Sequence, residues 1–303
     1  MPLKRVVSVS LGSSKRDHKI EAQILGQAFT VERRGTDGSL ERAVALIREL
    51  DGKVDAIGLG GVDLYLVSGR RRYVLRDARQ MLEAATETPV VDGTGLKNTL
   101  ERRTVAWLDD HDVVKFSGKE ILLVSALDRY GMAEEMLARG GRLLLGDALF
   151  GLGLPLPLRS LRSLGALLWV LSPIVCRLPM SVLYPTGKKQ EEITPRFGRY
   201  YRAADIIAGD LHFIRRYMPD TLQGKIIITN TVTADNEEEF RERGVHMLVT
   251  TTPKMEGRSF GTNVMEGILV ALAGKHPDDL EEGTYEALLE SMDLTPRVEI
   301  LDE

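Results

Sequence analysis

A lysine and an amide stand at the start of a predicted helix, just after a glycine-rich loop. The loop has the sequence DGTG, and Lys97 and Asn98 follow it after one leucine. Glycines let the backbone approach a ligand closely, and a lysine ammonium can carry a proton to or from a substrate oxygen. We interpret Lys97 as a candidate general acid/base and Asn98 as a residue that orients the substrate. Asp63, after an earlier glycine pair, or Asp92 would set the lysine pKa. A glycine-rich turn with a solvated lysine, and a turn-capping aspartate, are the alternatives.

A second candidate site follows an apolar strand predicted at residues 121–124. Helical spacing begins at residue 132, and another apolar strand at 142–145 completes a βαβ unit. The amino end of the helix in such a unit has unpaired N–H groups and a dipole that favours a phosphate. The turn before this helix would therefore bind the pyrophosphate of a nucleotide. The residues assigned to this contact are Ser125, Asp128, Arg129 and Gly131.

Asp147 stands where the ribose is expected. It lies 19 positions beyond Asp128, and a dinucleotide-binding unit places an acidic residue about 20 positions after its turn. Such a residue accepts the ribose hydroxyls and repels a 2′-phosphate, so the spacing favours NAD over NADP. The turn contains one glycine where the dinucleotide motif has three. A βαβ unit that serves only as scaffold is the alternative.

Three later strands also end in small polar residues. They are predicted near residues 204–208, 225–229 and 245–250. Because the carboxyl ends of parallel strands share one edge of a sheet, these ends would line the second half of a nucleotide cleft. The residues assigned to it are Asn230, Thr231 and Thr251.

Two further stretches have the residue types that bind an acidic substrate group. Ser13, Ser14 and Lys15 follow the first predicted strand, in a polar loop that we expect to open a helix. Small hydroxyl residues and a cation at a helix start suit a carboxylate or a phosphate. Lys188 belongs to a pair of lysines in a later turn and would contact the same kind of group. Solvated basic residues are the alternative in both places.

The composition is that of a globular protein and narrows the functional classes. Of 303 residues, 43% are hydrophobic and 28% are charged, and the formal net charge is −4. This mild acidity does not favour nucleic acid as a partner. The single cysteine, Cys176, excludes an intramolecular disulfide, and we expect it to be buried. No Cys/His cluster has the spacing of metal ligands, so no metal is expected.

The predicted location is cytoplasmic, because the sequence enters a strand-like segment at residue 6 without the apolar core of a signal peptide. Only residues 164–183 approach the length of a membrane span, and Pro173, Arg177 and Pro179 interrupt them. We therefore predict no membrane span and expect a buried helical hairpin there. Contact of this segment with a membrane surface is the alternative.

Apolar strands that alternate with helical spacing predict an α/β protein of two domains with mainly parallel sheets. Residues 1–112 form the first, substrate-binding domain. Residues 113–259 form a Rossmann-like dinucleotide-binding domain with an apolar helical insertion at about 150–190. Residues 260–303 are expected as helices that pack back on the first domain. Because apolar insertions of this kind often form oligomer contacts, we expect a homodimer.

This order of elements, with an apolar helix after the tripeptide GTN, resembles the architecture of the shikimate and quinate dehydrogenases. Several stretches are similar to bacterial proteins named quinate 5-dehydrogenase. The loop Lys97-Asn98-Thr99 and the helix from Gly261 to Leu272, with Met265, are the counterparts. The family motifs Asn-x-Thr-x-Pro-x-Lys and Gly-x-Gly-Gly are absent. The resemblance implies a nicotinamide-dependent alcohol/ketone oxidoreductase that holds its substrate between the domains.

We therefore predict an NAD(P)-dependent oxidoreductase that acts on the alcohol or ketone of a small polar substrate. The alternative is a regulatory protein that binds a nucleotide or metabolite without catalysis. It is favoured by the single glycine of the turn and by the lack of a Ser-His-Asp or Cys-His pattern.

Overall fold

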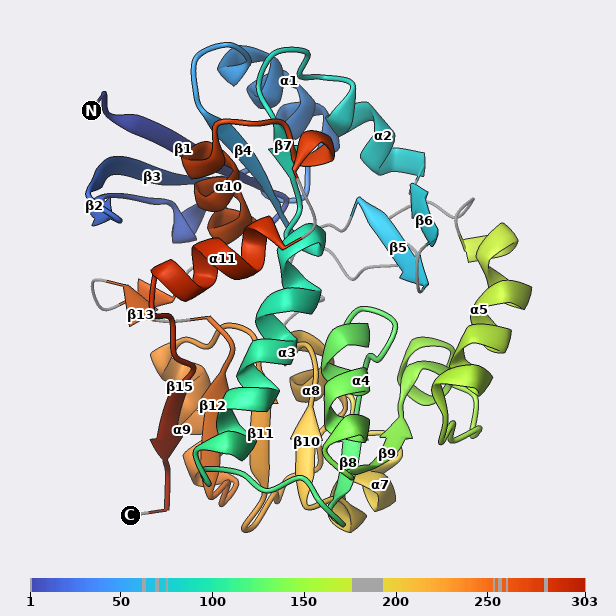
Figure 1. Ribbon diagram of the computed structural model, residues 1–303. Coiled ribbons are helices and arrows are strands. Elements are labelled where there is room, and N and C mark those ends of the chain that lie inside the picture. The colour runs from blue at the N-terminus through green and yellow to red at the C-terminus, as the bar shows by residue number, and fades with distance from the viewer. Residues whose placement is uncertain are drawn as a thin grey trace.

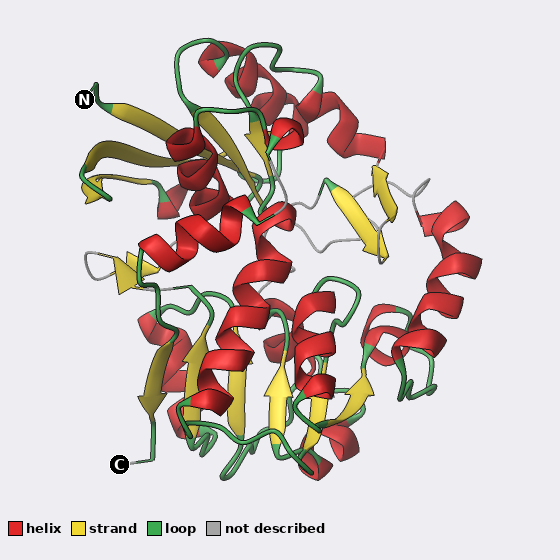
Figure 2. Ribbon diagram, viewed as in Figure 1, coloured by secondary structure: helices red, strands yellow, loops and turns green. Residues whose placement is uncertain are grey.

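The computed structural model describes residues 2–61, 64–68, 71–74, 76–175, 193–252, 254–255, 258–259, 261–280 and 283–302. Its framework consists of two mainly parallel sheets, of five and six strands. Helices pack on these sheets (Figures 1 and 2). The predicted α/β class with two parallel sheets is therefore confirmed.

The first sheet has the strand order β2-β3-β1-β4-β7, and only β2 runs antiparallel to its neighbour. Both faces are covered, because Val6 of β1 packs with residues of α10 while Val7 packs with residues of α1. The strands are β1 (Lys4–Ser10), β2 (His18–Ile24), β3 (Gln27–Gly35), β4 (Ala56–Gly60) and β7 (Val90–Val91). The helices around them are α1 (Leu40–Leu50), α2 (Arg76–Leu82), α10 (Thr262–Ala273) and α11 (Thr284–Ser291).

The segment after β1 differs from the predicted helix. A short 3-10 turn, Ser14–Arg16, leads directly into β2, which pairs with β3. Half-buried residues alternate with exposed ones along β2. This period of two is that of an edge strand with one covered face, so the predicted helix is wrong.

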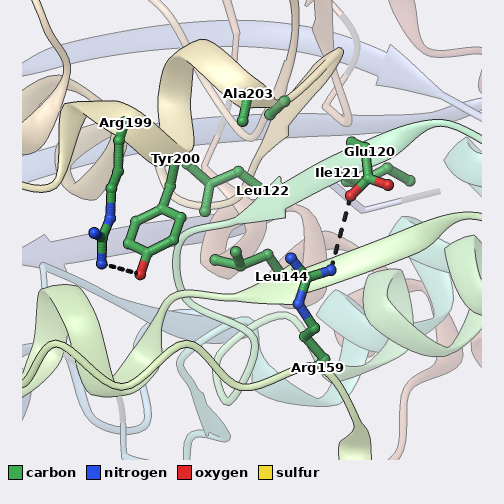
Figure 3. Close-up of a pocket in the computed structure, with 9 residues that line it drawn as sticks. Glu120, Ile121, Leu122, Leu144, Arg159, Arg199, Tyr200 and Ala203 are labelled. Atoms are coloured by element: carbon green, nitrogen blue, oxygen red, sulfur yellow. Dashed lines mark hydrogen bonds and ion pairs between the residues drawn. The ribbon is translucent and has the colours of Figure 1, made fainter.

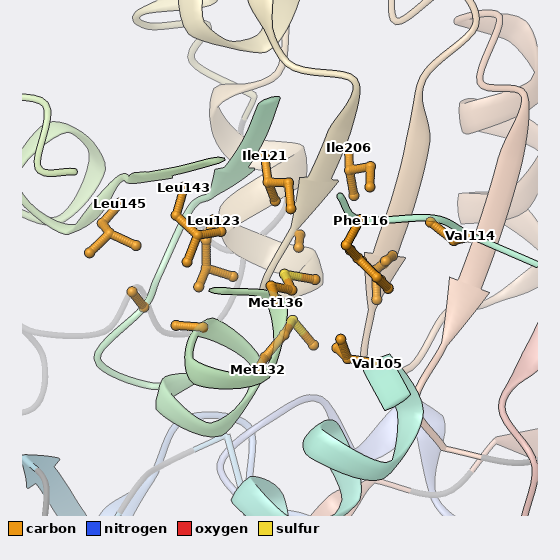
Figure 4. Packing of buried hydrophobic residues seen from close by; sticks show 14 of the residues in the cluster. Val105, Val114, Phe116, Ile121, Leu123, Met132, Met136, Leu143, Leu145 and Ile206 are labelled. Carbon is orange, nitrogen blue, oxygen red and sulfur yellow. The ribbon is translucent and has the colours of Figure 1, made fainter. Parts of the chain in front are cut away.

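The second sheet has the strand order β9-β8-β10-β11-β12-β15. The core under α3 and α4 contains Phe116, Met132 and Met136 (Figure 4), and the core on the opposite face contains Tyr201 and Phe240. The strands are β8 (Glu120–Leu123), β9 (Arg142–Leu145), β10 (Ile206–Ala208), β11 (Ile226–Thr229), β12 (Met247–Thr250) and β15 (Arg297–Ile300). The helices are α3 (Thr94–Asp110), α4 (Tyr130–Ala138), α7 (Gly198–Ala203), α8 (Leu211–Tyr217) and α9 (Ala234–Glu242).

Two segments connect the sheets. α3 begins after β7 of the first sheet and packs on α4 of the second. α10 returns to the first sheet, where it contacts β1, β4 and β7. The C-terminal segment was expected as helices on the first domain, but after α11 it crosses back and adds β15 antiparallel to β12.

The insertion after β9 contains a π-helical turn, Asp147–Gly151, and α5 (Leu161–Val175). The buried helical hairpin expected at residues 164–183 falls partly on α5, where Leu164 and Leu168 are buried while Trp169 and Val170 are exposed; its part beyond residue 175 lies outside the described residues. Cys176 lies outside the described residues. No helix within the described ranges is long and apolar enough to cross a membrane. The remaining elements are the hairpins β5 (Tyr65–Ser68) with β6 (Arg71–Val74) and β13 (Lys254–Met255) with β14 (Arg258–Ser259), and a 3-10 turn, Pro277–Asp279.

The carboxyl ends of β8 and β10 form the switch point of the second sheet. The chain leaves β8 to form β9 on one side and later returns to form β10 on the other. In open α/β sheets ligands bind beyond the strand ends at such a point.

Candidate functional site

Five charged side chains meet at this switch point, and we call them the central charge cluster: Lys97, Glu101, Asp128, Arg129 and Asp210. Lys97 Nζ donates a hydrogen bond of 2.6 Å to Asp128 Oδ1. Arg129 donates to Glu101 Oε1 and, over 3.3 Å, to Asp210 Oδ2. Its Nε also lies 3.2 Å from Asp128 Oδ2. One arginine thus joins three carboxylates.

The cluster follows from the way α3 packs on α4. Lys97 and Glu101 are one helical turn apart on α3, so they face the same neighbour. That neighbour is the turn before α4, which supplies Asp128 and Arg129. Close packing of the two helices depends on Gly131, where an added Cβ would lie 2.6 Å from the backbone oxygen of Asn98.

The side chains of the cluster differ in how far they are exposed to solvent. The side chains of Arg129 and Glu101 are 3% and 1% exposed, whereas Asp128 is 29% exposed and Lys97 10%. A small molecule in solvent therefore reaches the Lys97–Asp128 pair before the other two. Lys97 follows the carboxyl end of β7 and Asp128 that of β8, so the pair joins the carboxyl ends of both sheets.

Burial and neighbouring charges shift the pKa values of the cluster in different directions. Burial raises the pKa of Glu101 to about 7, although Arg129 opposes the shift. Burial also acts against the charge of Asp128, but Lys97 and Arg129 outweigh it and lower the pKa of Asp128 to about 2. For Arg129, the three carboxylates outweigh burial and raise the pKa above its ordinary value. Near neutral pH, Asp128 is ionised and Glu101 is close to its midpoint.

Ser125 adds a polar group that the protein itself does not satisfy. It lies two residues after β8, is 8% exposed, and is next to Gly209, which follows β10. Within the described part of the chain, Ser125 Oγ and Glu101 Oε2 have no hydrogen-bond partner. Buried polar atoms without a partner are rare, and a ligand at the switch point would explain them.

In the predicted cofactor turn, by contrast, side chains of the protein already accept the hydrogen bonds of the backbone N–H groups. Asp147 accepts from the backbone N–H of Ala126 at 3.1 Å and of Leu127 at 2.9 Å. Asn98 Oδ1 accepts from the N–H of Gly131 at 2.9 Å. These are the donors that a pyrophosphate would use, so Asp147 and Asn98 have other partners than the predicted ribose and substrate.

Burial raises the pKa of Asp147 to about 6, while the two N–H groups of the turn oppose this shift. Each carboxylate oxygen of Asp147 accepts a hydrogen bond from one of these two N–H groups.

The DGTG loop has a different role from the predicted one. Asp92 does not pair with Lys97; it accepts from Leu64 N at 2.6 Å and from the backbone and hydroxyl of Thr94, each at 2.8 Å. An added Cβ at Gly93, whose φ is 93°, would lie 2.8 Å from the backbone nitrogen of Asn263. The close approach therefore serves packing on α10 instead of a ligand.

The predicted residues on the later strand ends bond to other polar residues of the same strand ends. Asn230 Nδ2 donates to Asp210 Oδ2 at 3.1 Å, which ties it to the central charge cluster. The hydroxyls of Thr231 and Thr252 are 3.3 Å apart, and Thr251 is buried.

The predicted anion loop is also tied to the protein. Ser14 donates to Asp37 from its N–H at 2.7 Å and its hydroxyl at 3.0 Å. Ser13 Oγ accepts from Lys15 N at 3.2 Å. Among the described residues, no hydrogen bond or ion pair joins this loop to the central charge cluster. Asp63 and Lys188 lie outside the described residues.

The sequence interpretation missed Glu101 and Asp210. Glu101 stands four residues after Lys97, the spacing that places two side chains on one helix face. Asp210 follows β10 and caps α8 by accepting from His212 N at 2.9 Å. Both signals were readable, but their convergence on Arg129 depends on tertiary packing.

Two cavities lie outside the cluster. One, of about 380 Å³, is lined by residues of α3, α10 and α11. Glu266 lies on its wall and accepts from Gly93 N at 2.7 Å and from the Tyr285 hydroxyl at 3.0 Å. The other, of about 250 Å³, lies beside β8 and β9, where Glu120, Leu122 and Leu144 line it (Figure 3). No three His, Cys, Asp or Glu side chains among the described residues are arranged to hold a metal ion.

The fold and the site define a two-sheet α/β protein with a charged site between the strand ends. The chain belongs to the family described as "Domain of unknown function (DUF8754)", which matches residues 95–301. A second family, "Domain of unknown function (DUF8753)", matches residues 5–92. The two matches meet where α3 begins. No curated protein matches the chain.

Several solved structures are similar at low identity. The NAD-dependent malic enzyme of Thermotoga maritima is 13% identical with a TM-score of 0.40, over 99% of this chain and 80% of that one. A glutamate dehydrogenase of Thermus thermophilus is 12% identical with a TM-score of 0.43, over 96% and 74%. An arabinose-binding protein of Geobacillus stearothermophilus is 10% identical with a TM-score of 0.43, over 99% and 98%.

Proposed function

We propose that the protein is an enzyme of the oxidoreductase type that transfers a proton at the oxygen of an alcohol or ketone. Its substrate would be a small polar molecule held between the two sheets. The observation that supports this is the 2.6 Å pair of Lys97 and Asp128 at the carboxyl ends of both sheets. The pair combines a proton-carrying group with a carboxylate that orients it.

The roles within the pair follow from their surroundings. When a ketone is reduced, negative charge develops on its oxygen, and the Lys97 ammonium would stabilise that charge and donate the proton. In the reverse direction the neutral amine would accept the proton of the alcohol. Asp128 keeps the lysine in place, and its low pKa keeps it a carboxylate near neutral pH. Arg129 in turn positions Asp128.

A nicotinamide dinucleotide would be the electron carrier of such a reaction, and NAD was the sequence prediction. The turn after β8 does not fit its pyrophosphate, because Asp147 and Asn98 occupy the turn's donors. The proposal therefore assigns no residue to the cofactor and depends on the proton step alone.

The test is turnover by Lys97→Met in a screen of alcohols and ketones with NAD and NADP. Quinate and shikimate come first because of the sequence resemblance. Loss of a general acid/base lowers kcat by about 100- to 10,000-fold. Lys53→Met, which changes an exposed lysine of the first sheet's surface, is the matched control. Full turnover by Lys97→Met would remove this residue from the mechanism.

The second candidate is a metabolite-binding protein without catalysis. The closed cofactor turn favours it, and so does the unsatisfied Ser125 hydroxyl, which needs a ligand but no reaction. A ligand that binds only the folded state raises the apparent melting temperature. A shift with a polyol or hydroxy acid, no shift with either dinucleotide and no turnover would favour this candidate over the enzyme.

A further inference from the structure

The outward face of α5 carries large apolar side chains where a surface helix normally carries polar ones. Leu164 is buried in the core of the second sheet, and Leu168 is also buried. The opposite face presents Trp169, 71% exposed, and Val170, 60% exposed. Leu154 and Leu156, in the loop before the helix, are 48% and 50% exposed. In Figure 1, α5 stands at the edge of the molecule away from the N-terminus.

The charged residues of this segment of the chain are all basic. Arg162 lies one helical repeat before Trp169 on the same side of α5, and Arg159 precedes the helix. From residue 148 to residue 175 the sequence has these two arginines and no carboxylate, and up to residue 190 it adds three more cations. The rest of the chain contains 35 basic and 44 acidic residues. Residues 148–175 therefore form an apolar, basic edge, and the rest of the chain is an acidic body with more carboxylates than cations.

From this polarity we infer that α5 docks on an anionic lipid surface. We define the docking surface as Leu154, Leu156, Arg159, Arg162, Trp169 and Val170. Interfacial helices combine large apolar residues with Lys and Arg, and tryptophan favours the boundary between headgroups and acyl chains. α5 has 15 residues, about 22 Å of helix, which is too short for an apolar layer of about 30 Å. It would lie in the surface without crossing it.

The second cavity adds cationic groups beside this surface. Arg159 and Arg199 lie on its wall, over a floor that includes Leu122 and Leu144 (Figure 3). Arg159 lies 3.9 Å from Glu120 and remains 65% exposed. An exposed guanidinium at this place can pair with a lipid phosphate.

A second copy of the chain fits this surface less well. Two copies meeting through α5 would bring like charges together. The apolar side chains expose on the order of 500 Å², less than the about 800 Å² per partner of a stable interface. The acidic body would also repel its counterpart, whereas on an anionic surface the basic edge turns that body away from the lipid.

The experiment is co-sedimentation of the full chain with vesicles. Phosphatidylcholine vesicles are compared with vesicles that also contain phosphatidylglycerol. We expect binding to the mixed vesicles and a marked loss at high salt, because salt screens the attraction. Removing both charges in Arg159→Gln/Arg162→Gln should weaken binding about 25-fold, at about fivefold for each charge. Trp169→Ala should weaken it at least tenfold.

Two control variants remove similar groups elsewhere. Arg48→Gln/Lys53→Gln takes two charges from exposed positions at the end of α1, and Leu3→Ala removes an apolar side chain that is 55% exposed. Both should bind vesicles like the unchanged protein. In a Trp107→Phe background, the remaining Trp169 should shift its fluorescence to the blue on binding.

Three results would overturn the inference. These are no binding to the mixed vesicles, equal binding to both kinds of vesicle, and loss of binding in the control variants. Light scattering that finds a dimer which Trp169→Ala converts to a monomer would assign the surface to a second copy. None of these readouts depends on turnover, so they stand apart from the proposed function.

Discussion

Glu101→Gln tests the assignment of a half-ionised carboxyl in the central charge cluster. The side chain of Glu101 is 1% exposed and its partner Arg129 is 3% exposed, so solvent screens neither. Burial raises the pKa of Glu101 from its ordinary 4.5 to about 7. The folded state therefore holds this proton more tightly than the unfolded state does. As a result, Glu101 lowers the stability of the fold as the pH rises from about 4.5 to about 7.

The size of the effect follows from the two pKa values. At 1.36 kcal/mol for each pKa unit, their separation corresponds to about 3 kcal/mol. Glutamine can still accept a hydrogen bond from Arg129 but cannot ionise. Part of this difference is already lost at pH 5, so the free energy of unfolding of Glu101→Gln, relative to the unchanged protein, should rise by about 2–3 kcal/mol between about pH 5 and about pH 8.

The assay is urea unfolding at both pH values, followed by circular dichroism. The matched control is Glu83→Gln in the turn after α2, because Glu83 is 70% exposed, and its relative stability should be the same at both pH values. If the free energy of unfolding of Glu101→Gln differed from that of the unchanged protein by the same amount at both pH values, Glu101 would not be the group that titrates. The electrostatic description of the cluster would then be wrong.

Four further substitutions test the local structure by urea unfolding. Asp147→Asn weakens the acceptor of two turn N–H groups, so at about pH 8 it should lower the free energy of unfolding by about 1–3 kcal/mol; an unchanged value would mean that Asp147 does not hold the turn. Gly131→Ala places a Cβ 2.6 Å from the backbone oxygen of Asn98 and should cost about 1–3 kcal/mol. At Gly165 an added Cβ would have no atom within 4 Å, so Gly165→Ala should stabilise α5 by up to about 1 kcal/mol. Equal effects of Gly131→Ala and Gly165→Ala would contradict the packing of α3 on α4. Thr233→Ala breaks the capping box of α9 and should cost about 1 kcal/mol.

Local signals in the sequence account for most of the sheet framework. Continuous apolar runs at 121–124 and 142–145 predict buried parallel strands, and β8 and β9 form there. The prediction failed where the pattern was weaker. β2 alternates between half-buried and exposed residues until its last residue, Ile24, which is buried, and β15 is an edge strand with no fully buried residue. Edge strands depend on a neighbour that lies far away in the sequence, so they are hard to predict from local periodicity.

The candidate site was predictable in its residue types but not in its pairing. Lys97 is identified by the loop before it, and Asp128 by the turn after β8. Their contact spans 31 positions of sequence and depends on α3 lying against α4. Asn98 was expected at the substrate, yet the same packing directs its side chain to Gly131 N. Short-range motifs place residues near strand ends, and the packing of helices decides which of them meet.

The closed turn and the accessible pair together constrain the order of binding. A dinucleotide at the turn after β8 would have to displace Asp147 from two N–H groups and Asn98 from one. Each acceptor lost without replacement costs about 1–3 kcal/mol, so only the phosphate's own hydrogen bonds could offset the change. A small alcohol or ketone beside Lys97 and Asp128 requires no such exchange. We therefore expect a small polar substrate to bind without the dinucleotide, which is the reverse of the order in an enzyme whose cofactor builds the substrate site. Substrate titrations in the presence and absence of NAD would distinguish the two orders, and a strict requirement for NAD would show that the turn opens.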